Sequence, residues 1–310
     1  MKSSGDRTTI EINRLRKDRN AVILAHNYTL PEVQDIADFT GDSLSLSRQA
    51  AETAAQVIVF CGVRFMAETA AVLCRGKTVL HPDPNAGCPM ADMITPRQLA
   101  ELKQQHPGAV VLTYVNSSVE IKAQSDICCT SANAAEVLKS IPLGKEVIFI
   151  PDRNLARWAV EQTGRPNVII YNGFCPTHMR ILPEMVEKAR KEHPNALFLA
   201  HPECRLEVWK MADKVASTSG MLKFVQQSPA KEFIVGTESG MIYALKRVAP
   251  DKQFYPVAPE PIATCSNMKL INLQKILWSL QDLAPKVEVP DDLAQKALAP
   301  IQRMLEIKGK

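Results

Sequence analysis

Short apolar runs alternate with amphipathic stretches along the chain. Residues 21–25, 57–60 and 147–150 are uninterrupted apolar runs, which is the pattern of strands buried on both faces of a parallel sheet. Segments such as residues 96–105 and 183–192 begin with proline and carry apolar residues at helical spacing, so they are predicted to be amphipathic helices. This alternation predicts an α/β fold in which helices cover parallel sheets.

The same reasoning predicts the order of elements along the whole chain. Strands are predicted at residues 21–25, 57–60, 78–80, 110–113, 147–150, 168–170, 196–199 and 233–235. Helices are predicted at residues 10–17, from Pro31, from just after Ser43 to about residue 54, and then at 66–73, 96–105, 132–138, around Trp158, 183–192, 221–226, around Tyr243 and 268–283. The order of helix and strand starts again near residues 91 and 181.

Three sets of polar or thiol residues recur at one period of 87 to 90 residues. They are the cysteines Cys88, Cys175 and Cys265, the post-strand residues His26, Tyr114 and His201, and the hydroxyl residues Ser43, Ser131 and Thr218. Three sets with one period indicate a triplicated unit. We therefore predict three α/β/α units, at residues 1–90, 91–180 and 181–310, each with a small parallel sheet. The helix at 268–283 is predicted to close the array.

Every landmark follows a predicted strand or precedes a predicted helix. In parallel α/β units, ligands bind beyond the carboxyl ends of the strands. Three units around a pseudo-threefold axis would therefore turn these residues toward one central active-site cavity. The hydroxyl residues that precede helices are also interpreted as N-caps, each worth about 1 kcal/mol. Three helix N-termini directed at one cavity would bind carboxylate or phosphate groups.

The periodic cysteines lack the C-x-x-C pairs that usually mark zinc or iron-sulfur sites. One thiolate from each unit would instead form a three-cysteine site. A [4Fe-4S] cluster held in this way leaves one iron open to act as a Lewis acid. The alternative is that the three are packed core thiols, but their shared period favours the cluster. The cysteines without counterparts at the period are predicted to be structural, namely Cys61, Cys74, Cys128, Cys129 and Cys204.

Three tripeptides follow equivalent strands, and each carries polar side chains at its ends. Their sequences are HNY at 26–28, YVN at 114–116 and HPE at 201–203. For any single His or Tyr, the simpler interpretation is a core residue with its hydrogen bonds satisfied. Imidazoles, phenols, a carboxylate and an amide at equivalent places indicate instead a shared scaffold whose copies perform different catalytic tasks.

Composition narrows the class of protein. The 310 residues include 37 Lys and Arg against 33 Asp and Glu, a net charge of +4, so we expect neither a nucleic-acid nor a membrane partner. The start of the chain is polar, and no apolar run approaches the ~20 residues of a membrane span, so we expect a cytoplasmic protein. Eight cysteines in such a chain favour free thiols or metal ligands over disulfides.

The chain resembles the quinolinate synthase (NadA) family over roughly residues 20–270. The resemblance rests on motifs that occur together and in order: HNY at 26–28, GDS at 41–43, GCPMA at 87–91, YVN at 114–116, NGFC at 172–175, HPE at 201–203, STSG at 217–220 and GTE at 236–238. It implies three pseudo-symmetric α/β domains around a [4Fe-4S] cluster with an open iron. It also implies an enzyme that condenses iminoaspartate with dihydroxyacetone phosphate to quinolinate, phosphate and water in de novo NAD biosynthesis.

Partners and regulation also follow from the resemblance. It implies L-aspartate oxidase as the supplier of iminoaspartate, and the iron-sulfur assembly machinery as the source of the cluster. Some family members carry a C-x-x-C-x-x-C run that ends at the third ligand. The equivalent positions here are Pro259 and Ile262, so thiol-disulfide regulation by that run is not expected.

Carried over position by position, the resemblance assigns roles to individual residues. It implies cluster ligands at Cys88, Cys175 and Cys265. It implies substrate contacts at His26, Ser43, Tyr114, Val115, Asn116, Ser131, His201, Pro202, Glu203 and Thr218. Tyr28 and Glu203 are predicted to move protons, while His26 and His201 orient oxygens or serve as acids.

Two alternatives remain open at this point. An aconitase-like [4Fe-4S] hydro-lyase acting on another dicarboxylate would also use an open iron and carboxylate contacts. A non-enzymatic iron-sulfur protein would need the three cysteines, but it would have little use for the His, Tyr, Glu and Ser residues at the same period.

Overall fold

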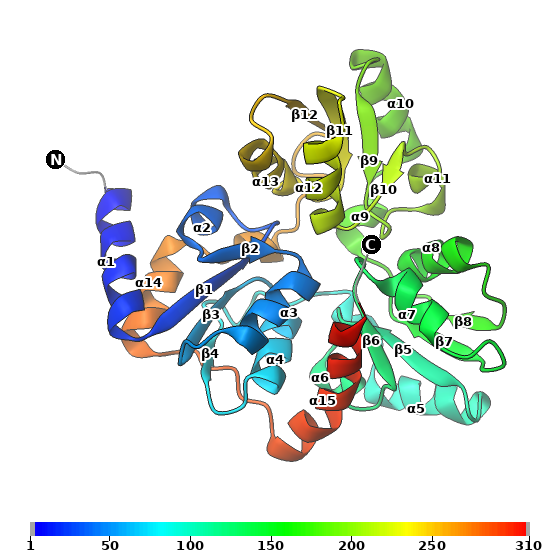
Figure 1. Ribbon diagram of the computed structural model, residues 1–310, viewed down its shortest axis with the longest axis horizontal. Coiled ribbons are helices and arrows are strands. Elements are labelled where there is room, and N and C mark those ends of the chain that lie inside the picture. The colour runs from blue at the N-terminus through cyan, green and yellow to red at the C-terminus, as the bar shows by residue number, and fades with distance from the viewer. Residues whose placement is uncertain (1–3, 308–310) are drawn as a thin grey trace.

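The computed structural model describes residues 4–307 and contains a parallel four-stranded sheet in each third of the chain (Figure 1). The strand orders are β2-β1-β3-β4, β6-β5-β7-β8 and β10-β9-β11-β12. The three orders are the same when counted within each unit, so one topology is repeated three times. The predicted α/β fold with three small parallel sheets is confirmed. The unit boundaries at residues 90 and 180 stay a prediction.

The first unit has one sheet between two layers of helices. Its elements are α1 (Ser4–Asp18), β1 (Ala21–His26), α2 (Pro31–Ile36), β2 (Phe39–Gly41), α3 (Ser43–Glu52), β3 (Val57–Cys61), α4 (Arg64–Leu73) and β4 (Thr78–Leu80). Neighbouring side chains of β1 enter different cores: Leu24 packs in a cluster with residues of α3 and α4, whereas Ile23 packs with residues of α1 and of the C-terminal helix α14 (Leu273–Asp282). Burial on both faces explains the uninterrupted apolar sequence of this strand.

The second and third units repeat this arrangement. The second unit contains a 3-10 helix (Ala91–Met93), α5 (Pro96–Gln105), β5 (Val110–Tyr114), α6 (Val119–Lys122), β6 (Ile127–Cys129), α7 (Ala134–Ser140), β7 (Val147–Ile150), α8 (Arg153–Thr163), β8 (Val168–Ile170) and α9 (Pro176–Met179). The third contains α10 (Pro183–Glu192), β9 (Leu197–Ala200), α11 (Leu206–Trp209), β10 (Lys214–Val215), α12 (Thr218–Gln227), β11 (Glu232–Gly236), α13 (Met241–Val248) and β12 (Gln253–Pro256). None of the helices among the described residues is both long and apolar enough to cross a membrane.

The C-terminal segment returns to the first two units. The helix predicted at residues 268–283 is two elements, a 3-10 helix (Asn267–Lys269) and α14, because the Asn272 side chain accepts a hydrogen bond from the backbone of Lys275 and starts a new helix there. Helix α14 packs beside α1 (Figure 1). The last helix, α15 (Asp291–Glu306), was not predicted, and it packs on β6, α6 and α4.

Two sets of polar residues, which the sequence interpretation missed, also follow the period. Asp38, Asp126 and Asp213 precede the edge strands, and each accepts a hydrogen bond of 2.7 or 2.8 Å from a backbone N–H of the central strand of its sheet. Lys77, Arg165 and Lys252 donate to the C-terminal carbonyls of the equivalent helices α3, α7 and α12. A cation at the C-terminus of a helix satisfies free carbonyls and complements the helix dipole.

Arg165 provides a test of this helix capping. Its buried guanidinium donates to four carbonyl oxygens, those of Leu138, Ile141, Pro142 and Lys145. Replacement of Arg165 by methionine should lower the free energy of unfolding by about 3 kcal/mol, because hydrogen bonds to a charged group are lost and buried carbonyls remain unpaired.

Urea-induced unfolding measures this change. The matched control is Arg157→Met on the exposed face of α8, which should alter stability by no more than about 0.5 kcal/mol. Equal stability of the two variants would contradict a structural role for the Arg165 cap.

Candidate active site

Loops from the three units meet at one central cavity with a volume of about 240 Å³. Residues at or just after the carboxyl ends of β1, β5 and β9 line it, together with the cysteine loops of all three units. In each sheet the first strand of the unit lies beside the third, so the strand order reverses between these two central strands. In α/β proteins, ligands bind at the carboxyl ends of the strands at such a switch point. The predicted central cavity is therefore present.

Most residues predicted from the sequence line this cavity. They are His26, Tyr28, Ser43, Cys88, Tyr114, Asn116, Ser131, Cys175, His201, Glu203, Thr218 and Cys265. Val115 and Pro202 are buried but do not line the cavity, because they are the middle residues of tripeptides whose first and third side chains do. A substrate contact through either of these two side chains stays a prediction.

The hydroxyl residues Ser43 and Thr218 are the first residues of their helices, and their interpretation as N-caps is wrong. The N-caps are the preceding residues, Asp42 and Ser217, whose side chains accept backbone N–H groups of the first turn. Ser131 lies in the turn before α7. Both Ser43 and Thr218 line the cavity, and the Thr218 hydroxyl accepts a hydrogen bond of 2.9 Å from Asn27 Nδ2.

Cys88, Cys175 and Cys265 differ from the other cysteines in their exposure. All eight cysteines lie within the described residues and are free, but only these three are partly exposed, and all three line the cavity. The other five are buried, as expected for structural thiols. One partly exposed thiol from each unit is a set of soft donors that fits an iron-sulfur cluster.

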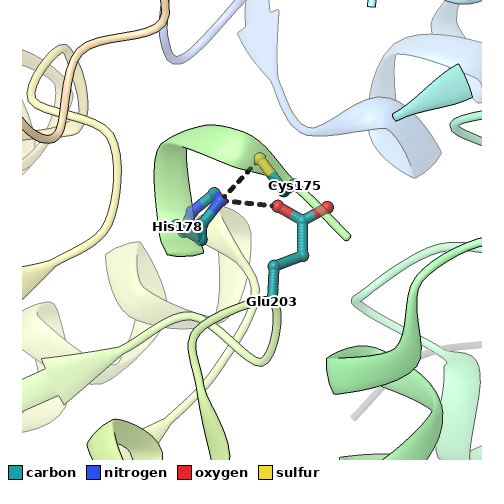
Figure 2. A group of neighbouring side chains, drawn as sticks. All are labelled: Cys175, His178 and Glu203. Carbon is teal, nitrogen blue, oxygen red and sulfur yellow. Dashed lines mark hydrogen bonds and ion pairs between the residues drawn. The ribbon is translucent and has the colours of Figure 1, made fainter. Parts of the chain in front are cut away.

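Cys175 has two further neighbours that can bind metal. The ligand atoms of Cys175, His178 and Glu203 lie within 4.8 Å of one another (Figure 2). The Nδ1 atom of His178 is 3.1 Å from Cys175 Sγ and 2.8 Å from Glu203 Oε2. His178 was not predicted to be a site residue. The available signal was its place three residues after a cysteine, which puts both side chains on one side of the short helix α9.

Two buried carboxyl groups hold the cysteine loops of the second and third units. Asp152 Oδ2 accepts a hydrogen bond of 3.1 Å from the backbone N–H of Cys175, and Glu238 Oε1 accepts one of 3.0 Å from that of Cys265. Burial raises the pKa of both carboxyl groups, although Lys269, 2.9 Å from Glu238, opposes this rise for Glu238. Both acids lie two residues after a buried strand, a shared position that the sequence interpretation did not use.

His26 and His201, two of the three histidines that line the cavity, have the same tautomer. His26 Nδ1 accepts the backbone N–H of Tyr28 at 3.2 Å, and His201 Nδ1 accepts that of Glu203 at 3.3 Å. Burial lowers the pKa of His26 to about 4 and that of His201 to about 3, so both rings are neutral at pH 7. Their proton is then on Nε2, which in His201 lies 3.2 Å from Ser131 Oγ. Both rings are therefore neutral hydrogen-bond donors.

Glu203 is a buried carboxylate on the cavity wall, only 3% exposed. Burial alone would raise its pKa, but the attraction of His178 and hydrogen bonds from His178 and Tyr114 lower it to about 2. Asn116 Nδ2 lies 3.5 Å from Glu203 Oε1. Burial, and then the negative charge of Glu203, raises the pKa of the Tyr28 and Tyr114 phenols. The site thus combines the ionised carboxylate of Glu203 with the protonated phenols of Tyr28 and Tyr114 at pH 7.

Comparison with known proteins identifies the family. The family described as "Quinolinate synthetase A protein" matches residues 10–306 of the chain. The chain belongs to this family. It is 53% identical over 297 residues to a quinolinate synthase of Geobacter metallireducens, with 96% of each chain covered. It is 51% identical over 302 residues to that of Thermodesulfovibrio yellowstonii, covering 97% of this chain and 99% of the relative. A Methanosarcina barkeri relative with the same description is 52% identical over 297 residues, 96% of each chain.

Membership in the quinolinate synthetase A family confirms the resemblance found in the motifs. The chain is an enzyme of the quinolinate synthase type, and its substrates are small molecules. The cavity of about 240 Å³ suits small-molecule substrates, since several polar groups surround it.

Proposed function

We propose that the enzyme condenses iminoaspartate with dihydroxyacetone phosphate to give quinolinate, phosphate and water in NAD biosynthesis. The observation that carries this proposal is the cavity, where one partly exposed cysteine from each of three units lies with acid, base and hydroxyl groups. In this proposal Cys88, Cys175 and Cys265 hold a [4Fe-4S] cluster. A cluster with three protein ligands supplies a Lewis-acidic iron for substrate oxygens.

The hydroxyl groups of Ser43, Ser131 and Thr218 bind the anionic groups of the substrates in this proposal. All three line the cavity, and Ser43 and Thr218 stand at the N-termini of ten-residue helices. Free backbone N–H groups and the helix dipole favour carboxylate and phosphate there. The triose phosphate would lose its phosphate in this hydroxyl-lined part of the cavity.

Glu203 and Tyr28 are proposed to move the protons of tautomerisation, ring closure and dehydration. Glu203 is ionised at pH 7 and can accept a proton, and Tyr28 is protonated and can donate one. His26 and His201 are neutral, so we assign them the orientation of substrate oxygens through Nε2–H rather than action as cationic acids. Tyr114 and Asn116 complete the polar wall beside Glu203.

The cell context of the proposal follows from the substrates. We propose L-aspartate oxidase as the source of iminoaspartate and the iron-sulfur assembly machinery as the source of the cluster. We propose the cytoplasm as the location, where thiols remain reduced and free to bind iron.

Anaerobic purification followed by iron, sulfide and product analysis tests the proposed function. We expect about four irons and four sulfides per chain and quinolinate from the two substrates together. Absence of iron and sulfide after reconstitution would refute the assignment of a [4Fe-4S] cluster. An iron-loaded protein that hydrates or dehydrates another dicarboxylate, without forming quinolinate, would identify an aconitase-like hydro-lyase instead.

A further inference from the structure

Each short helix that follows a tripeptide of the cavity wall carries a buried side chain at the same position. These residues are Gln34 of α2, Lys122 of α6 and Trp209 of α11, and each is the fourth residue of its helix. Their exposed fractions are 1%, 0% and 5%, and none of the three lines the central cavity. The period of the chain therefore extends to a set of residues outside the cavity lining.

Gln34 and Lys122 make the same hydrogen bond in their own units. Gln34 Nε2 donates to Thr29 O at 3.0 Å, and Lys122 Nζ donates to Ser117 O at 2.7 Å. Thr29 and Ser117 are equivalent residues, since each directly follows its tripeptide. An amide and an ammonium group thus perform one task, which is to hold the end of a tripeptide loop.

The same two side chains also reach a neighbouring unit. Lys122 Nζ donates to Phe65 O at 3.3 Å, at the start of α4 in the first unit. Gln34 Nε2 lies 3.5 Å from Gly240 O, directly before α13 in the third unit. Helix α6, which carries Lys122, packs beside α4 (Figure 1). Each of these side chains therefore joins its own loop to the start of a helix in another unit.

The third unit is joined to its neighbour by a different residue. Trp209 Nε1 has no hydrogen-bond partner among residues 4–307. Instead Asn154, in the first turn of α8 in the second unit, donates from Nδ2 to Glu203 O at 3.0 Å. The first loop is thus joined to the third unit, the second loop to the first unit, and the third loop to the second unit. These contacts form a closed ring around the cavity.

Lys122 is the charged side chain of this ring. A buried ammonium group is unfavourable unless its three N–H donors have partners. Ser117 O and Phe65 O accept two of them, and Nζ lies 5.4 Å from the centre of the Phe65 ring, within the range of a cation–π contact. These partners belong to the loop of the second unit and to the first unit, so the ammonium group is held between the two.

The loop that Lys122 holds faces the carboxylate of Glu203. The Ser117 N–H donates to Val115 O at 2.8 Å, so residues 115–117 form a tight turn. Asn116, in the middle of this turn, lines the cavity, and its Nδ2 is 3.5 Å from Glu203 Oε1. A hydrogen bond to Ser117 O therefore restrains the turn that presents Asn116 to the cavity.

We propose that Lys122 is a positioning residue, which fixes the Asn116 side chain on the cavity wall by hydrogen-bonding its loop to the first unit. The inference rests on the proposed function, because it takes Asn116 as a contact of substrate and product. The role requires N–H donors and not a positive charge, since the neutral amide of Gln34 makes the equivalent contacts.

A double-mutant cycle with Asn116 tests this inference. The variants are Lys122→Met, Lys122→Gln, Asn116→Ala and the Lys122→Met/Asn116→Ala pair, purified anaerobically and compared at equal iron content. The measurements are the dissociation constant of quinolinate, by equilibrium dialysis, and the melting temperature. Methionine is apolar and has no N–H donor, so Lys122→Met should weaken quinolinate binding about 10-fold. Glutamine keeps N–H donors and should stay within about 3-fold of wild type.

The cycle and a surface control separate action through Asn116 from a general effect. In the Asn116→Ala background, Lys122→Met should weaken binding by less than about 3-fold. Lys191→Met, on the exposed surface of α10, should leave the dissociation constant unchanged.

Each other outcome overturns a stated part. Wild-type affinity in Lys122→Met, or an undiminished loss in the Asn116→Ala background, would refute positioning of Asn116. Equal losses in Lys122→Gln and Lys122→Met would refute the role of the hydrogen bonds. If methionine lowers iron content or the melting temperature, Lys122→Ala is compared with Lys122→Gln at equal iron content, and equal affinity of these two would also refute it. An iron-loaded wild type that neither forms nor binds quinolinate would refute the proposed function itself.

Discussion

Replacement of Glu203 by glutamine is expected to reduce the rate of quinolinate formation by about 10² to 10⁴-fold while the protein keeps its iron. The amide has the size of the carboxyl group, but it cannot take up a proton. It also removes the negative charge that His178 Nδ1 faces at 2.8 Å. The measurement is quinolinate formed by anaerobic enzyme, normalised to iron content, because a lost cluster would mimic a lost base.

A matched control is available in the same unit. Glu207 is an exposed residue of α11, and Glu207→Gln should keep wild-type activity. If Glu203→Gln turned over at the wild-type rate with its iron intact, the assignment of proton transfer to Glu203 would be wrong.

The second large effect is expected at the cysteines. Replacement of Cys175 by alanine should leave the enzyme without stable iron and without detectable quinolinate formation, because only two of the three thiolates of the proposed cluster remain. The measurement is iron and sulfide per chain after anaerobic reconstitution, together with product formation. Alanine at Cys88 or Cys265 should have the same effect, since each unit contributes one ligand.

Cys128 provides the control for loss of a thiol. It is fully buried in β6 and does not line the cavity, so Cys128→Ala should keep the iron and most of the activity. Its expected cost is about 1 kcal/mol of stability from a small core cavity. Wild-type iron content in Cys175→Ala, or equal iron loss in Cys128→Ala, would contradict the proposed ligand set.

Strands with consecutive aliphatic residues and helices with a regular apolar face were predictable, because these patterns are strong. The strands at residues 147–150 and 168–170 and the helices at 96–105 and 183–192 have the observed bounds. The edge strands β2, β6, β10 and β12 were missed because none of them contains two consecutive aliphatic residues, whereas the equally short edge strands β4 and β8 do and were predicted. Their pairing is set by tertiary contacts, such as that of Asp38 with the backbone of the central strand.

The site was predictable where residues recur at the period and not where it depends on contacts between units. Asp152 and Glu238 hold cysteine loops, but the equivalent place in the first unit is Val63, so they form no complete periodic set. Thr237 and Tyr28 are in contact although 209 residues separate them in the chain. No local sequence pattern indicates a contact between residues so far apart, because the contact forms only after the sheets have packed.

The sequence by itself determined the three-unit α/β fold and most of the polar residues that line the cavity, because a repeated unit places equivalent residues at equivalent strand ends. Only the tertiary structure decided which residues act on one another there. Burial keeps His26 and His201 neutral, so that they act as hydrogen-bond donors. The packing of three units brings His178 and Thr237 between Glu203 and Tyr28. Hydrogen bonds and desolvation depend on distances in space, and the period along the chain does not contain those distances.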